Sequence, residues 1–146
     1  MAESNLSRGT SEHLGHTFRQ TTRAVDVSVT PRFIPEQSNP AENLYVWSYE
    51  IEITNRGEEG VQLKSRYWRI MSGHGQLIEV RGAGVVGDQP LIRPGSSYTY
   101  TSYTHLPTPS GMMTGTYRMK TDAGEAFDVD VPAFSLDSPA QIALPN

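Results

Sequence analysis

The stretch from residue 45 to residue 53 alternates large apolar side chains with small or charged ones, and this two-residue period is typical of a half-buried β-strand. One face of it carries only aromatic and β-branched residues: Tyr45, Trp47, Tyr49, Ile51 and Ile53. No part of the chain keeps an apolar period of 3.6 residues over three helical turns. Short strands separated by frequent Gly and Pro turns predict an all-β protein, an antiparallel β-sandwich of about seven or eight strands.

Further segments have the composition or the alternation of strands. They cover residues 21–30, 61–72, 76–81, 97–104, 114–121 and 126–131. Residues 55–60 are turn-forming and include Gly57 and Gly60, so we expect the strand that starts at Val61 to return as a hairpin beside the strand 45–53.

The predicted strand 61–72 changes the face on which its apolar residues lie. Leu63 falls on one face, whereas Trp68 falls on the other. An inserted residue would restore a single buried face, so we predict a β-bulge near Arg66 or Tyr67.

The length of 146 residues fits one domain. Residues 1–20 are polar and show neither period, which indicates a disordered N-terminal tail. The sandwich domain is expected to cover residues 21–136, and residues 137–146 to form a C-terminal tail.

The composition indicates a cytoplasmic protein. There is no cysteine, no apolar run of the roughly 20 residues that a membrane-spanning helix needs, and no secretory signal at the N-terminus. The formal net charge is -4, yet residues 61–121 carry seven basic and two acidic side chains. This asymmetry indicates either an anionic partner or basic residues scattered over solvent-facing strands, and we favour the second interpretation.

Residues 82–87 read GAGVVG, which matches the GxGxxG pattern of dinucleotide-binding folds. In those folds the third glycine opens a helix, and an acidic residue follows about 20 positions later. Here Pro90 and Pro94 would break such a helix, and no Asp or Glu lies between Asp88 and Asp122. We therefore expect a connection between strands with no helix after it.

Several longer motifs resemble one family of small bacterial proteins, the ApaG family. They are HGQLIEVRGAGVVGDQPLIRPG, YTYTS, LPTPSGMMTGTYRM and FDVDVPAFSL, and the resemblance covers roughly residues 22–136. It implies a fold similar to an immunoglobulin or fibronectin type III sandwich. It also implies a link to cobalt tolerance and magnesium efflux, with no settled biochemical activity, and related domains serve protein interaction in certain F-box and DNA-polymerase-interacting proteins.

Two candidate sites follow from these observations. Backbone amides of Gly82, Gly84 and Gly87, flanked by Arg81 and Arg93, could bind phosphate, and the resemblance implies a pyrophosphate site there. Alternatively the glycines only permit a bulge and a tight strand crossing, and we favour this structural role.

The second candidate site is a protein-interaction surface. Tyrosines are common at interfaces, and a proline-rich loop is rigid and exposed. The candidates are Tyr98, Tyr100, Tyr103, Leu106, Pro107 and Pro109.

The residues favour neither catalysis nor a metal site. His74 and His105 lie in predicted loops, and no serine has the GxSxG surroundings of a hydrolase nucleophile. The carboxylates of the hairpin tip and the last strand are attributed to solubility. We therefore expect a non-catalytic domain that binds a protein partner, without cofactor, metal, membrane or nucleic acid; the alternative function is weak binding of phosphate or a nucleotide.

Overall fold

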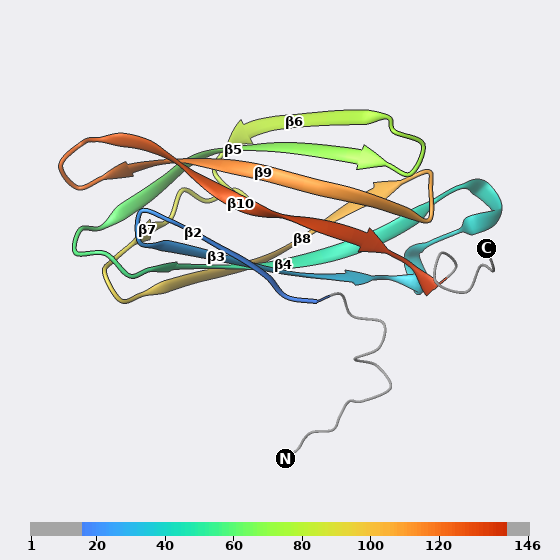
Figure 1. Ribbon diagram of the computed structural model, residues 1–146, viewed down its shortest axis with the longest axis horizontal. Helices are drawn as coiled ribbons and strands as arrows, with labels where there is room; N and C mark the ends of the chain where they lie inside the picture. Colours follow the sequence, from blue (N-terminus) through green and yellow to red (C-terminus); the bar gives the residue numbers. More distant parts are fainter. Residues whose placement is uncertain (1–15, 140–146) are drawn as a thin grey trace, which may run out of the picture.

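The computed structural model describes residues 16–139, which form two antiparallel sheets packed face to face (Figure 1). One sheet has the order β2-β3-β4-β8, with β2 at Phe18–Thr22, β3 at Val25–Phe33, β4 at Tyr45–Asn55 and β8 at Ser97–Leu106. The other has the order β10-β9-β5-β6, with β10 at Ala126–Asp137, β9 at Ser110–Thr121, β5 at Val61–Ser72 and β6 at Leu77–Ala83, and the short β7, Leu91–Ile92, also pairs with β5. The expected β-sandwich is confirmed, and β2 and β7 raise the number of strands to nine in the described part of the chain.

The predicted hairpin between β4 and β5 is wrong. The two strands lie in different sheets, and the turn between them crosses from one sheet to the other. Asn55 holds this crossing: its buried side-chain amide donates to the carbonyls of Glu59 and Ile92, and its side-chain oxygen accepts from the Gly57 amide. A turn composition specifies a reversal of the chain but not the strand with which the chain then pairs.

A β-bulge in β5 confirms the change of face that the sequence predicts. The register with β9 shifts between Leu63 and Ser65, so the extra residue is Lys64, slightly earlier than expected. As a result Leu63 and Trp68 are both buried between the sheets.

The predicted domain boundaries need correction at both ends. Strand β2 starts at Phe18 and pairs with β3, whereas the sequence predicts a tail up to residue 20. The Phe18 ring lies 6.3 Å from that of Phe134, and this single apolar residue is too little to produce a visible period in the sequence. At the other end β10 includes Asp137, and the buried Ser138 donates a hydrogen bond to the Pro109 carbonyl. Residues 1–15 and 140–146 lie outside the described residues.

Aromatic side chains fill the middle of the sandwich. The Trp68 ring meets the rings of Tyr49, Tyr117 and Phe134 edge-on, at centroid distances between 5.6 and 6.3 Å. The five residues predicted for the buried face of β4 are all buried, as expected. Edge-to-face contacts add specific attraction to the apolar burial that stabilises this core.

The two lateral sides of the sandwich differ. On one side β10 packs against β2 and β3, and the Asp130 amide donates to the Thr22 hydroxyl across the two sheets. On the other side β6 is the outermost strand of its sheet (Figure 1). Within residues 16–139, one margin of the five-stranded sheet is therefore covered and the opposite margin is open.

Candidate functional site

The glycine motif forms a tight turn at the end of β6. Val85 and Asp88 exchange two backbone hydrogen bonds of 2.8 Å, and the residues between them, Val86 and Gly87, both have positive φ. This is the backbone pattern of a two-residue type I′ turn. No helix follows, as the two prolines predict.

Gly84 is required by its surroundings. Its φ is +62°, its amide donates to the Lys64 carbonyl, and a Cβ atom at this position would overlap the backbone carbonyl of Asp88. The next residue, Val85, is fully buried and belongs to the core. The motif therefore anchors the end of β6 to the sandwich.

Gly82 makes room for Arg66, which the sequence indicates only as a possible position of the bulge. The Arg66 guanidinium lies across Gly82, where a Cβ would come within 2.8 Å of it, and donates to the carbonyls of Ala83 and Gly84. The sequence contains one signal for this inward-facing position: Arg66 precedes the buried Trp68 by two residues and so shares its face.

The proposed anion donors do not converge. The amides of Gly84 and Val85 in the motif, and that of Asp88 directly after it, donate to carbonyls of the chain itself. The Arg81 guanidinium lies 4.1 Å from the centroid of the Tyr67 ring.

Arg93 lies far from Arg81. It follows β7, which pairs with β5 at Val61, whereas Arg81 lies opposite Tyr67. Six residues of a strand span about 20 Å, so the two arginines cannot hold the same phosphate.

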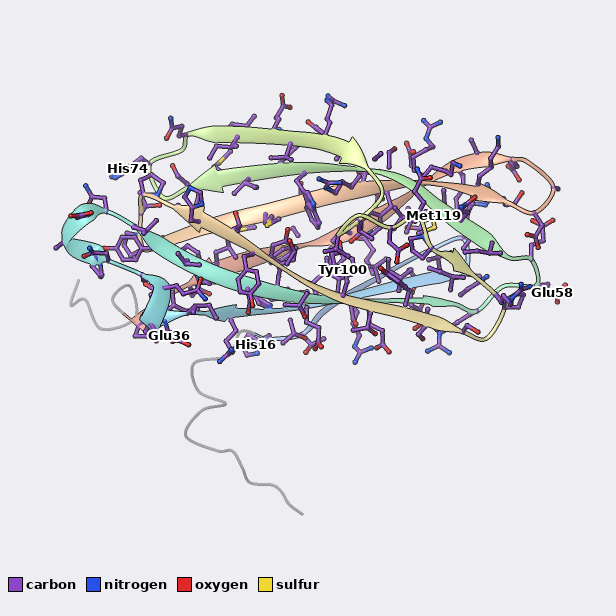
Figure 2. The ribbon with its side chains drawn as sticks, turned by 180° about the vertical axis from the view of Figure 1, so that it is seen from behind. His16, Glu36, Glu58, His74, Tyr100 and Met119 are labelled. Atoms are coloured by element: carbon purple, nitrogen blue, oxygen red, sulfur yellow. The ribbon has the colours of Figure 1, made fainter. Side chains whose placement is uncertain are left out.

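Two of the interaction candidates are buried, and these predictions are wrong. Tyr100 points into the space between the sheets (Figure 2), where its hydroxyl shares a hydrogen bond of 2.6 Å with that of Tyr117. Burial raises the pKa of both tyrosines well above the ordinary value. Leu106 is fully buried at the end of β8. Alternation along a strand shows which residues share a face but not which face is covered.

The other interaction candidates have at least partial exposure. Tyr103 is 58% exposed on the outer face of β8, and Pro107 is also exposed. Tyr98 and Pro109 are half-buried, and the Tyr98 hydroxyl donates to the Asp88 carboxylate over 3.1 Å. These residues are dispersed along β8 and the loop after it.

Strand β6 presents the most concentrated exposed apolar surface in the described residues. The side chains of Leu77, Ile78 and Val80 are between 37 and 43% exposed, and β6 pairs only with β5 in this part of the chain. We call Leu77–Ala83 the β6 edge. The sequence predicts a strand at residues 76–81 but not its position at a margin of the sheet.

An apolar row extends the β6 edge across the outer face of the sheet. Met71 lies opposite Leu77 on one side and opposite Met112 on the other, and both methionines are more than 40% exposed. Three neighbouring strands thus contribute to one apolar surface, which is the usual sign of a protein contact.

The charged residues of the β6 edge are held in place by Tyr67. The Tyr67 hydroxyl donates to Glu79 over 2.5 Å, and Arg81 stacks on the ring of the same tyrosine. The hydrogen bond with Glu79 raises the pKa of Tyr67. A negative and a positive charge are therefore displayed side by side on the outer face.

The carboxylates and histidines of residues 16–139 do not gather into a group of three or more that could hold a metal ion. Glu58 and His74 lie at opposite ends of the sandwich (Figure 2). No helix among the described residues has the length and apolarity needed to cross a membrane.

Comparisons with known proteins agree with this geometry. The family model of the ApaG domain matches residues 35–121. Protein ApaG from Methylobacterium sp. (strain 4-46) is 56% identical over 122 residues, which are 84% of this chain and 94% of that protein. Protein ApaG from Rhodospirillum centenum is 50% identical over 129 residues, 88% of this chain and 99% of that protein.

A solved structure also has the same fold. The crystal structure of an ApaA protein from Bordetella pertussis superposes with a TM-score of 0.77 at 48% identity, and the match covers 79% of this chain and 94% of that one. The two chains therefore share one fold over most of their length. This chain therefore belongs to the ApaG domain family.

Proposed function

We propose that this chain is a non-catalytic protein-binding domain, and that its docking site is the β6 edge. The observation that carries the proposal is a seven-residue strand at a margin of the sheet that nothing within residues 16–139 covers, with its apolar side chains exposed. The absence of cysteine supports placing this binding in the cytoplasm.

An edge strand is a template for another strand. Its outward N–H and C=O groups are not paired within the sheet, so an extended segment of a partner gains backbone hydrogen bonds by lying beside it. Side chains of such a segment would meet Leu77 on the outer face and Ile78 on the inner face, since successive residues alternate. The adjacent charges of Glu79 and Arg81 would select partners with complementary charges.

This proposal also accounts for the cobalt and magnesium tolerance that the family resemblance implies. A domain that binds a cation transporter or its regulator through β6 would affect cation levels without holding a cation itself. A partner-mediated effect needs no metal-binding cluster in this chain.

A photo-crosslinking experiment in cells tests the docking site. A photoreactive phenylalanine analogue is placed at Leu77 and, as a matched control, at Thr99, which is exposed on the outer face of the other sheet. We expect adducts from position 77 but not from position 99, and we expect Val80→Lys to suppress them because lysine on an edge opposes strand addition. Equal adducts at both positions, or adducts at 77 that persist with Val80→Lys, would contradict the proposal.

The second candidate function is weak binding of phosphate or pyrophosphate at the glycine turn. It is supported by the amides of Val86 and Gly87, which donate to no acceptor within residues 16–139, and by the exposed Arg81. Exposed charges are screened by salt, so we expect only millimolar, salt-sensitive binding. An NMR titration with pyrophosphate should shift these two amides, and Arg81→Ala should weaken the shifts; no shift at millimolar ligand would remove this candidate.

A further inference from the structure

The sequence of the β6 edge is complementary to itself. Resting on the proposed function of this edge as a docking site, we infer that the segment it receives is β6 of a second copy of this chain. The two strands run antiparallel about a two-fold axis at Val80, so that the five-stranded sheets of two copies join into one continuous sheet.

This register brings opposite charges together twice. When Val80 lies opposite Val80 of the second copy, Glu79 lies opposite Arg81 of that copy, and its Glu79 lies opposite this Arg81. Opposite charges directly across an antiparallel pair are stabilising, and like charges are destabilising.

Neighbouring registers lose this match. If the axis moves by one residue toward the N-terminus, Glu79 lies opposite Glu79; if it moves toward the C-terminus, Arg81 lies opposite Arg81. An axis between two residues places a charge opposite an apolar residue and reverses the face of one sheet. Only the register centred on Val80 pairs both charges.

The side chains are already arranged for this contact in the single chain. Tyr67 holds Glu79 through its hydroxyl and Arg81 on its ring, so both charged groups are presented on the outer face. Arg69 lies opposite Glu79 on β5. Across the joint, Arg69, Glu79 and the second copy's Arg81 would form a row of alternating charge.

The inner face is also compatible with the pairing. The two Val80 side chains would meet at the axis, and Ile78 would lie opposite Gly82 of the second copy, beside the Arg66 guanidinium that lies across this glycine. Both Ile78 and Val80 are 37% exposed in the single chain, so the pairing would remove apolar surface from water.

The contact is small, because each copy contributes one strand of seven residues. We therefore expect a weak dimer, with a dissociation constant on the order of 10 to 100 µM. The apolar row of Met71, Leu77 and Met112 would lie away from the axis, at the two ends of the joint.

Charge reversal tests the inference in the full chain by sedimentation velocity over a range of micromolar concentrations. Glu79→Arg places two arginine pairs across the joint, and Arg81→Glu places two glutamate pairs there. We expect each variant to raise the dissociation constant about tenfold or more. Mixing the two variants should restore the dimer, because every arginine then faces a glutamate.

The doubly exchanged chain, Glu79→Arg with Arg81→Glu, is the control for net charge and for the loss of the Tyr67 contacts. It keeps the net charge of the natural chain and should dimerise alone. The inference is overturned if the natural chain stays monomeric at several hundred micromolar, or if neither the mixture nor the double exchange restores association.

The outcome is distinguishable from a failure of the proposed function. Adducts at position 77 with the mass of two chains belong to the self-pairing, whereas adducts with a different protein support the docking edge alone. If the chain is monomeric and still gives specific adducts with a different protein, the pairing with a second copy is refuted and the proposed function stands.

Discussion

The strands at the two margins of the five-stranded sheet both carry apolar residues but have opposite surroundings. Strand β10 places Val129, Val131, Phe134 and Leu136 in the core, because β2 and β3 of the other sheet pack against it. Strand β6 is also apolar, yet nothing in the described part of the chain covers it, and all but Gly82 of its residues are exposed. The difference lies in what each strand faces and not in its own composition.

This comparison separates two uses of apolar side chains. Apolar side chains on β10 stabilise the fold. Those on β6 contribute little to the free energy of unfolding and are available to a partner. Substitutions on β10 should therefore lower the free energy of unfolding much more than substitutions on β6.

The largest effect is expected at the covered margin. Phe134 contacts the rings of Phe18, Tyr49 and Trp68 and is fully buried, so Phe134→Ala should lower the free energy of unfolding by about 4 kcal/mol. Urea unfolding followed by tryptophan fluorescence measures this. A loss below about 1 kcal/mol would mean that the margin is not packed as described.

At the open margin the strongest effect should come from the backbone of the glycine turn. Gly84→Ala adds a Cβ that overlaps the Asp88 carbonyl at positive φ, and we expect a loss of about 3 kcal/mol. Gly87→Ala is the matched control, since its Cβ meets open space and only the positive φ costs about 1 kcal/mol. Equal losses in the two variants would show that Gly84 is not sterically restricted.

Alkaline pH should destabilise the buried core between the two sheets. Burial raises the pKa of Tyr100 and Tyr117, so the folded state keeps both hydroxyls neutral while the unfolded chain ionises near pH 10. The contribution of these two neutral, buried hydroxyls to the free energy of unfolding is complete below about pH 10 and is lost as the pH rises above it. Urea midpoints from pH 8 to 11 should fall, and absorbance at 295 nm should show at least two tyrosines that ionise only with unfolding.

A smaller effect is expected from the strand that covers β10. Phe18 is half-buried against Phe134, so Phe18→Ala should lower the stability by about 1.5 kcal/mol. Thr17→Ala, at the exposed neighbouring position, is the control and should change little. An unchanged midpoint in both variants would mean that β2 does not contribute to closing this margin.

The smallest effect should come from the open margin itself. Val80→Ala should change the free energy of unfolding of the monomer by no more than about 0.5 kcal/mol, because the side chain is already partly in water. The measurement is urea unfolding at low protein concentration. A loss above about 1.5 kcal/mol would show that β6 is covered and would remove the contrast with β10.

Much of the fold could be predicted from local patterns. The alternation in residues 45–53 predicted the buried face of β4, the change of face in residues 61–72 predicted a bulge, and Pro90 and Pro94 predicted that no helix follows the glycines. Each of these rests on the geometry of a few consecutive residues, which the sequence contains in full.

The site was harder to predict for a physical reason. Tyr100 and Tyr103 have similar local sequences, but one hydroxyl meets Tyr117 from the other sheet and the other faces water. The role of Arg66 depends on the approach of the glycine turn, which returns beside it only after β5 and β6 have paired.

The sequence alone therefore determined the class of fold and the positions of most strands, because these follow from side-chain period and turn chemistry, and its longer motifs carried the resemblance to the ApaG family. Only the tertiary structure decided that β4 and β5 lie in different sheets, that Tyr100 and Leu106 are buried, and that β6 is left exposed by the described part of the chain. These features depend on which strands pair and which faces meet across the sandwich. Such contacts join residues far apart in the chain, and no local pattern encodes them.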